Sequence, residues 1–169
     1  MQRIGIYGGT FNPPHIGHIR SALEAVRTLR LDQLLVIPDR IAPHKEIPEG
    51  SPTPEQRLEM IRIAASHYEK MEVSDIELKR EGPSYTYLTV ETLRETYPDA
   101  KLYLIMGTDM FLSFHTWKNP EIILEHASLG VFYRGEKGEA DAIEELRARM
   151  ERQGNRVYLV KNEVVNISS

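Results

Sequence analysis

The sequence has 169 residues and contains no cysteine. This absence excludes disulfide bonds, thiol catalysis and metal sites built from cysteine, and it fits a reducing compartment. The sequence also has no run of about 18 apolar residues, so it predicts no membrane-spanning helix and no membrane partner. The N-terminus enters a strand-like segment without the long apolar stretch of a signal peptide, and we therefore expect a cytoplasmic protein.

The chain also has no excess of positive charge, since its formal net charge is −4. An acidic composition without a basic stripe excludes nucleic acid as an expected partner, although it is compatible with a local cationic pocket. Apolar residues make up 41% and charged residues 27% of the sequence, which predicts an ordinary hydrophobic core. The length predicts one domain that spans residues 1–169.

Short apolar runs alternate with segments that carry an apolar stripe at helical spacing. The runs predict strands at 3–7, 34–37, 71–78, 102–106, 129–133 and 157–160. The stripe of the first predicted helix contains Ile19, Ala22, Leu23, Val26 and Leu29. Thr53 to Gln56 is typical of a capping box at the start of the second helix. Continuous apolar strands are typical of a parallel sheet covered on both faces, so the predicted fold is α/β, a Rossmann-like doubly wound parallel sheet.

Ligands of such sheets collect at the carboxyl ends of the strands. Three loops directly follow predicted strands, at 8–14, at Gly107 to Asp109 and at Arg134 with Gly135. The predicted topology therefore places all three loops at one edge of the sheet.

The most informative segment is GGTFNPPHIGH at 8–18. Its glycines let a ligand approach the backbone closely, and the helix that follows presents free N–H groups and a partial positive charge. His15 and His18 are three residues apart, so in a first helical turn they would share a face and could cradle phosphate oxygens. A plain tight turn and a zinc-binding histidine pair are the alternatives. The dinucleotide fingerprint Gly-x-Gly-x-x-Gly is absent from the segment, which argues against a nicotinamide dehydrogenase.

Gly8 to His18 resembles the signature of the nucleotidyltransferase superfamily that carries a His-x-Gly-His motif. Further segments resemble those of bacterial nicotinate-nucleotide adenylyltransferases, in the same order along the chain. They are PHK at 43–45, PSYT at 83–86, ETL at 91–93, MGTD at 106–109, WK at 117–118, Arg134 and NISS at 166–169. The resemblance covers nearly the whole chain. It implies transfer of AMP from ATP to nicotinate mononucleotide, giving deamido-NAD and pyrophosphate in NAD biosynthesis.

The resemblance also implies roles for individual residues. The residues expected to be catalytic are His15, His18 and Lys45. The residues expected to bind ATP are Gly8, Gly9, Thr10, Phe11, His15, His18, Gly107, Asp109 and Ser168. The residues expected to bind the acceptor are Lys45, Tyr85, Thr86, Trp117 and Arg134. Mg²⁺ is expected to bind mainly through the phosphates of ATP, without a protein metal site, and a homo-oligomer is compatible with the sequence.

Simpler interpretations of some of these residues stay open at this point. Asp109 could cap a helix that begins at Met110. Ser84 or Thr86 could cap the helix that follows 83, and such a cap is compatible with acceptor binding. Trp117 could be an indole packed in the core.

The sequence departs from the family pattern at two places. Asn12 stands where aspartate is more usual, and the sequence ends at Ser169, before the threonine, isoleucine and arginine of the last motif. We therefore expect the chain as given to lack one cation of the triphosphate site. The rival functions are an adenylyltransferase for nicotinamide mononucleotide or phosphopantetheine, and a non-catalytic nucleotide-binding relative. The SYT and WK segments argue against phosphopantetheine, and His15, His18 and Lys45 argue against a relative that only binds.

Overall fold

The computed structural model describes residues 1–9, 11, 16–39, 49–133 and 137–162. Within these residues six strands form one sheet in the order β3-β2-β1-β4-β5-β6, and every neighbouring pair is parallel. The strands are β1 (Arg3–Gly9), β2 (Gln33–Pro38), β3 (Met71–Val73), β4 (Lys101–Met106), β5 (Ala127–Tyr133) and β6 (Val157–Lys161). The predicted Rossmann-like doubly wound sheet is confirmed, because this is the strand order of that fold.

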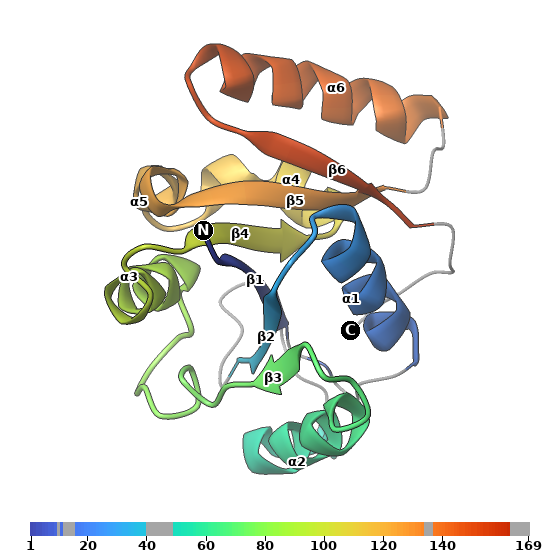
Figure 1. The fold of residues 1–169 in the computed structure, drawn as a ribbon, viewed down its shortest axis with the longest axis vertical. Coiled ribbons are helices and arrows are strands. Elements are labelled where there is room, and N and C mark those ends of the chain that lie inside the picture. Colours follow the sequence, from blue (N-terminus) through green and yellow to red (C-terminus); the bar gives the residue numbers. More distant parts are fainter. Residues whose placement is uncertain (10, 12–15, 40–48, 134–136, 163–169) are drawn as a thin grey trace.

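Helices cover both faces of the sheet (Figure 1). They are α1 (Ile16–Thr28), α2 (Pro54–Ala65), α3 (Thr86–Thr96), α4 (Thr108–Leu112), the 3₁₀ turn η1 (Phe114–Thr116), α5 (Pro120–His126) and α6 (Lys137–Arg152). The first two helices pack on one face, and α3 to α6 pack on the other. Within the described ranges, no helix combines the length and the apolar character that crossing a membrane requires.

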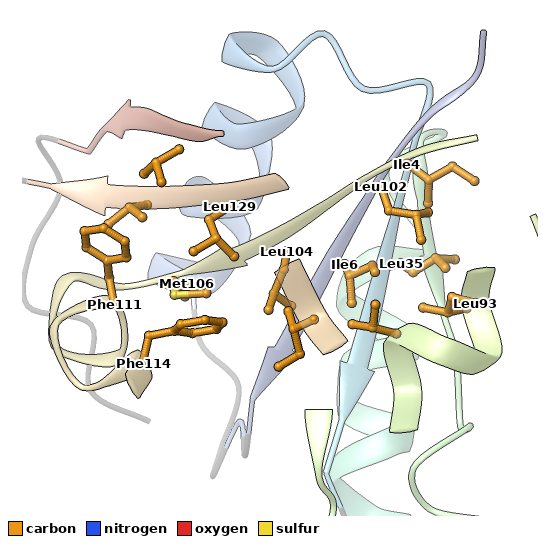
Figure 2. Packing of buried hydrophobic residues seen from close by; sticks show 14 of the residues in the cluster. Ile4, Ile6, Leu35, Leu93, Leu102, Leu104, Met106, Phe111, Phe114 and Leu129 are labelled. Carbon is orange, nitrogen blue, oxygen red and sulfur yellow. The ribbon is translucent and has the colours of Figure 1, made fainter. Parts of the chain in front are cut away.

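Side chains of each strand alternate between the two faces, as the period of two requires. In β1, Ile4 and Ile6 join the core beneath α3 to α6, whereas Tyr7 joins the core beneath α1 and α2. Figure 2 shows the first core, where leucines of neighbouring strands lie beside Ile4 and Ile6, and Phe111 and Phe114 close one end. The two cores together hold the sheet rigidly from both sides.

The strand predicted at 71–78 is wrong in its second half, because β3 ends at Val73. The Ser74 hydroxyl oxygen accepts a hydrogen bond from the N–H of Ile76 at 3.3 Å, and the Asp75 carbonyl accepts one from the N–H of Leu78 at 2.9 Å. These local bonds replace sheet pairing and make a turn. Leu78 is nevertheless buried, which explains why an apolar run was mistaken for a longer strand.

The apolar stripe predicted for α1 is correct only in part. Leu23 is 38% exposed, whereas Ala25, which the prediction left out, is fully buried beside Ala22. The small alanine side chains let the helix approach the sheet closely, and this requirement outweighs the greater hydrophobicity of leucine. The capping box predicted for α2 is confirmed, because the side chains and N–H groups of Thr53 and Gln56 bond reciprocally.

The C-terminal ends of α3 and α5 are joined by Arg94. Its Nη1 donates a hydrogen bond to the carbonyl of Ala100, and its Nη2 donates one to the carbonyl of His126, both at 2.7 Å. Ala100 follows α3, and His126 is the last residue of α5. Arginine is suited to this place because the last carbonyls of a helix lack partners within the helix and carry partial negative charge.

Gly5 lies in the middle of β1, where neighbouring side chains leave no room for a Cβ. An added Cβ would lie 2.5 Å from Cδ1 of Leu31, 2.8 Å from Cδ1 of Leu34 and 3.0 Å from Cδ1 of Ile105. All three leucine and isoleucine side chains belong to the core beneath α1 and α2. The glycine therefore allows this core to close over the central strand.

We predict that Gly5→Ala lowers the free energy of unfolding by about 1–3 kcal/mol, because three packed side chains must shift. Gly138→Ala is the matched control, since Gly138 is exposed in α6 and an added Cβ there meets no atom of the described residues within 4 Å. The control should leave stability unchanged or raise it slightly, because alanine is the better helix former. Urea unfolding measures both variants, and equal midpoints for the two would contradict the packing argument.

Candidate active site

The switch point of the sheet lies between β1 and β4, where the chain connections leave in opposite directions. β1 continues to β2 on one side, and β4 continues to β5 on the other. The register pairs Tyr7 with Ile105, so the ends of the two strands, at Gly9 and at Gly107, lie at the same edge of the sheet. In open α/β sheets, ligands bind in the crevice at such a point. Two of the three loops predicted to converge therefore begin here.

Phe11 stabilises the start of the glycine loop. Its backbone φ is +49°, a left-handed conformation that costs a non-glycine residue on the order of 1–2 kcal/mol, and the residue is only 2% exposed. The ring packs on Gly9, where an added Cβ would lie 3.2 Å from Cζ. It also makes edge-to-face contacts with Tyr7 and His18, at 5.5 and 5.0 Å between ring centroids. The strained turn thus fixes the imidazole of His18, which lies in the first turn of α1.

Some of the predicted site residues lie outside the described residues, namely Thr10, His15, Lys45, Arg134 and Ser168. Their roles stay predictions, and so does the contact of Phe11 with ATP. His18 is buried at 4% exposure, so a phosphate that contacts its imidazole must enter the crevice. Among the described residues, no three His, Asp or Glu side chains are grouped as a metal site.

Asp109 lies on the other side of the switch point, at the start of a short helix. α4 begins at Thr108 with Gly107 as its N-cap residue, so the alternative that Asp109 caps a helix beginning at Met110 is wrong. The Thr108 hydroxyl donates a hydrogen bond to the carbonyl of Phe132 at 2.7 Å and ties this helix start to β5. The side chain of Asp109 is exposed, and its carboxylate can accept hydrogen bonds from the hydroxyl groups of a ligand.

The segments that carry Tyr85 and Trp117 are distant in the sequence and adjacent in the structure. The Lys118 ammonium nitrogen lies 5.1 Å from the centroid of the Tyr85 ring, a favourable contact between a cation and an aromatic face. Trp117 is half-buried and packs on Phe114, with 5.1 Å between ring centroids. Because α3 and α5 each lead back to the start of the next strand, their N-termini lie at the carboxyl edge of the sheet. The two acceptor segments therefore share the edge of the switch point.

The N-terminus of α3 is suited to an anion. The helix begins at Thr86 with Tyr85 as N-cap residue, and the described chain shows no side-chain hydrogen bond at this cap. The alternative that Ser84 or Thr86 caps the helix is therefore wrong. Ser84 is buried and its hydroxyl instead bonds to the carboxyl group of Glu77. The first N–H groups of a helix bind anions well when no side chain satisfies them.

Sequence reasoning missed a buried polar network behind these segments. Arg57 of α2 is fully buried and lies 3.5 Å from the carboxylate of Asp39, the residue after β2. Glu77 is 7% exposed, and burial, with some repulsion from Asp39, raises the pKa of its carboxyl group to about 7. Arg57 could have been noticed, because it lies four residues before Ile61 on the buried face of α2. Glu77 gave no such signal, because it lies in a turn, where no periodic spacing of apolar residues predicts burial.

Comparison with known proteins gives the family. The chain matches the family described as Cytidylyltransferase-like over residues 6–169. The chain belongs to this family. The resemblance to nucleotidyltransferases inferred from the motifs is thereby confirmed, and the matched region contains all the predicted site residues.

Two relatives illustrate the similarity in sequence. A protein of Shewanella baltica (strain OS195), named "Probable nicotinate-nucleotide adenylyltransferase", is 44% identical over 132 residues, which cover 78% of this chain and 60% of that protein. A protein of the same name from Pseudomonas syringae pv. tomato is 44% identical over 134 residues, which cover 79% and 60%. The chain thus spans about 60% of the length of these curated relatives.

A solved structure supports the fold. The nicotinic acid mononucleotide adenylyltransferase of Plasmodium falciparum, complexed with NaAD, aligns with a TM-score of 0.75 over 98% of this chain and 78% of that chain. The sequence identity is 19%, and at this level the similarity shows the fold alone. The α/β architecture derived from the strand order and the architecture of this neighbour agree.

We predict that Glu77 makes the protein less stable as the pH rises. Its pKa increases from 4.5 to about 7 on folding, so between these values the folded chain holds a proton that the unfolded chain has lost. The stabilisation is complete below about pH 4.5 and is lost as the pH rises through about 7, a change on the order of 3 kcal/mol. The measurement is urea unfolding of wild type and Glu77→Gln across this range. Wild type should lose stability relative to the variant, and a constant difference would contradict the assignment.

Proposed function

We propose that this chain transfers AMP from ATP to nicotinate mononucleotide, with deamido-NAD and pyrophosphate as products. The relatives named for nicotinate-nucleotide adenylyltransferase support this reaction. The observation that carries the proposal is the contact of Lys118 with Tyr85. This contact brings the two predicted acceptor segments together at the carboxyl edge of the sheet, where the chain connections after β1 and β4 leave in opposite directions. The phosphate loop and the acceptor segments then face one crevice.

The chemistry requires alignment and charge neutralisation more than proton transfer. The phosphate of the mononucleotide is already an anion at neutral pH, so it can attack the α-phosphorus of ATP without a general base while pyrophosphate leaves. Catalysis of such a step rests on holding the reactants in line and on stabilising the charge that develops. The start of α1 supplies N–H groups and a partial positive charge, and His18 adds a donor fixed by Phe11.

The remaining roles follow the residue pattern. His18 contacts the α-phosphate, His15 holds the other phosphates and Lys45 clamps the reacting groups. Asp109, exposed in the first turn of α4, accepts hydrogen bonds from the ribose hydroxyls of ATP. The other proposed ATP contacts come from Gly8, Gly9, Thr10, Phe11, Gly107 and Ser168, and Arg134 completes the acceptor site.

The metal in this proposal enters with the nucleotide. Mg²⁺ would be held mainly by the phosphates of ATP and by water, and when bound it would supply charge neutralisation for the leaving pyrophosphate. The donors at the switch point, an imidazole and backbone N–H groups, suit phosphate oxygens rather than a cation. The cytoplasmic location and a homo-oligomeric state stay predictions from the sequence.

Recognition of the acceptor uses the start of α3 and the indole of Trp117. The first N–H groups of α3 and the hydroxyl of Thr86 bind the nicotinate carboxylate, while Trp117 stacks on the pyridine ring. The indole packs on Phe114 and is only half-buried, so part of its surface can receive a ring. An amide carries no charge for the helix start to stabilise, which favours the acid over nicotinamide mononucleotide.

We predict that nicotinate mononucleotide is the preferred acceptor. Pyrophosphate release should be measured with ATP, Mg²⁺ and one acceptor at a time, namely nicotinate mononucleotide, nicotinamide mononucleotide or phosphopantetheine. The kcat/KM for the acid should exceed that for the amide by about 100-fold, because a helix start and a hydroxyl discriminate the charge by a few kcal/mol. Comparable turnover of acid and amide would disprove the acceptor assignment. Binding of ATP without turnover of any acceptor would disprove the proposal that the chain is an adenylyltransferase.

We predict that His18→Ala lowers kcat by about 10²–10³, the usual cost of losing one donor to a developing charge. His67→Ala is the control, because His67 is exposed after α2 and should leave kcat unchanged. The assay is pyrophosphate release at saturating ATP and nicotinate mononucleotide, with thermal unfolding of both variants to verify folding. Near wild-type turnover in a folded His18→Ala variant would rule out the proposed role.

A further inference from the structure

We propose that Glu77 is a positioning residue, which holds the acceptor-binding start of α3 in place relative to the phosphate loop. This inference rests on the proposed function, because it concerns how nicotinate mononucleotide is held. Glu77 lies in the turn between β3 and α3 and is not one of the residues proposed to touch a substrate.

Glu77 contacts residues on both sides of the acceptor segment. The hydroxyl of Thr89 donates a hydrogen bond to Oε2 of Glu77 at 2.8 Å, and the hydroxyl of Ser84 bonds to the same carboxyl group. Ser84 precedes Tyr85 and Thr86, whereas Thr89 lies one turn further into the helix. Ser84 and Thr89 are 5% and 1% exposed, so water cannot replace these bonds. One carboxyl group therefore fixes the first turn of α3 from both ends.

The same carboxyl group lies beside the connection to the phosphate loop. Repulsion from Asp39 contributes to the raised pKa of Glu77, which places the two carboxyl groups within electrostatic reach. The backbone N–H of Asp39 donates a hydrogen bond to the carbonyl of Gly9 at 3.0 Å, and Asp39 pairs with Arg57. The end of β1 is thus linked to Asp39 by a hydrogen bond, and Asp39 acts on Glu77 beside the start of α3 through electrostatic repulsion.

The charged groups around Glu77 leave its protonation state balanced near neutral pH. Burial and Asp39 favour the neutral form, whereas Arg80 and the hydroxyls of Thr89 and Ser84 favour the carboxylate. Arg80 comes from the turn of Glu77 and also donates to Thr89 at 3.2 Å, while the charge of Arg57 is directed to Asp39. A carboxylate accepts both hydroxyls, whereas the protonated group has one oxygen occupied by its own proton. The position of Ser84 therefore depends on the charge of Glu77.

The experiment compares Glu77→Leu and Glu77→Gln with Glu81→Gln, an exposed carboxyl group in the same connection. KM and kcat are measured with ATP and nicotinate mononucleotide varied in turn. In Glu77→Leu the KM for the mononucleotide should rise about tenfold, the effect of about one lost buried hydrogen bond, while the KM for ATP changes less than about twofold. Glu77→Gln should give a smaller rise, and Glu81→Gln should give none.

The pH profile separates positioning from simple packing. In wild type the KM for nicotinate mononucleotide should change between pH 6 and pH 8. In Glu77→Gln the KM should stay constant over the same pH range. An equal rise of both KM values, or an unchanged profile in Glu77→Gln, would overturn the proposal. If Glu77→Leu does not fold, the isosteric Glu77→Gln alone tests the proposal. The readouts are then its KM for nicotinate mononucleotide compared with its KM for ATP, and the dependence of the former on pH.

A readout without catalysis keeps this proposal distinct from the proposed function. Amide hydrogen exchange of Leu88 to Val90 should be faster in Glu77→Gln than in Glu81→Gln, because the first hydrogen-bonded amides of α3 lose an anchor. Equal exchange in the two variants would overturn the role of Glu77 whatever the substrate. If the wild-type protein does not turn over nicotinate mononucleotide, the proposed reaction is refuted. Faster exchange in Glu77→Gln would then still support the positioning role of Glu77.

Discussion

Parallel pairing of all six strands constrains everything else in this molecule. After each strand the chain must return to the opposite end of the sheet before the next strand can begin. The helices in these connections cover both faces of the sheet. The central strands are consequently mostly apolar, and polar groups that serve a ligand are left to the ends of the strands. Between β1 and β4 the connections diverge, and ligands of such sheets bind at this point of the carboxyl edge.

The sequence predicted the features that depend on neighbours along the chain. The apolar runs of β1 and β4 and the capping box at Thr53 each have a local physical cause, and each lies where it was expected. Gly8 and Gly9, which were predicted to belong to a loop, instead extend β1. The assignment of both Tyr85 and Trp117 to acceptor binding came from family resemblance rather than from spacing. It agrees with the contact between Lys118 and the Tyr85 ring.

The features that the sequence did not reveal depend on contacts between distant segments. Glu77 and Asp39 each look like ordinary surface charges in the sequence, and only the fold buries them, with Asp39 beside Arg57. The end of β3 and the exposure of Leu23 were missed for a related reason. Hydrophobicity shows that a residue can be buried, whereas the space available against the sheet decides whether it is.

Arg94 lies far from the acceptor segments but affects how they are held, because it joins the opposite ends of α3 and α5. α3 and α5 start beside the ligand edge and are pinned together at their other ends through the carbonyls of Ala100 and His126. These hydrogen bonds restrain the distance between the two helices at that end, and the packing between α3 and α5 carries this restraint along their length. The separation of Tyr85 and Lys118 is therefore restrained from about 16 Å away, one length of α3, by a side chain that is not proposed to contact a substrate.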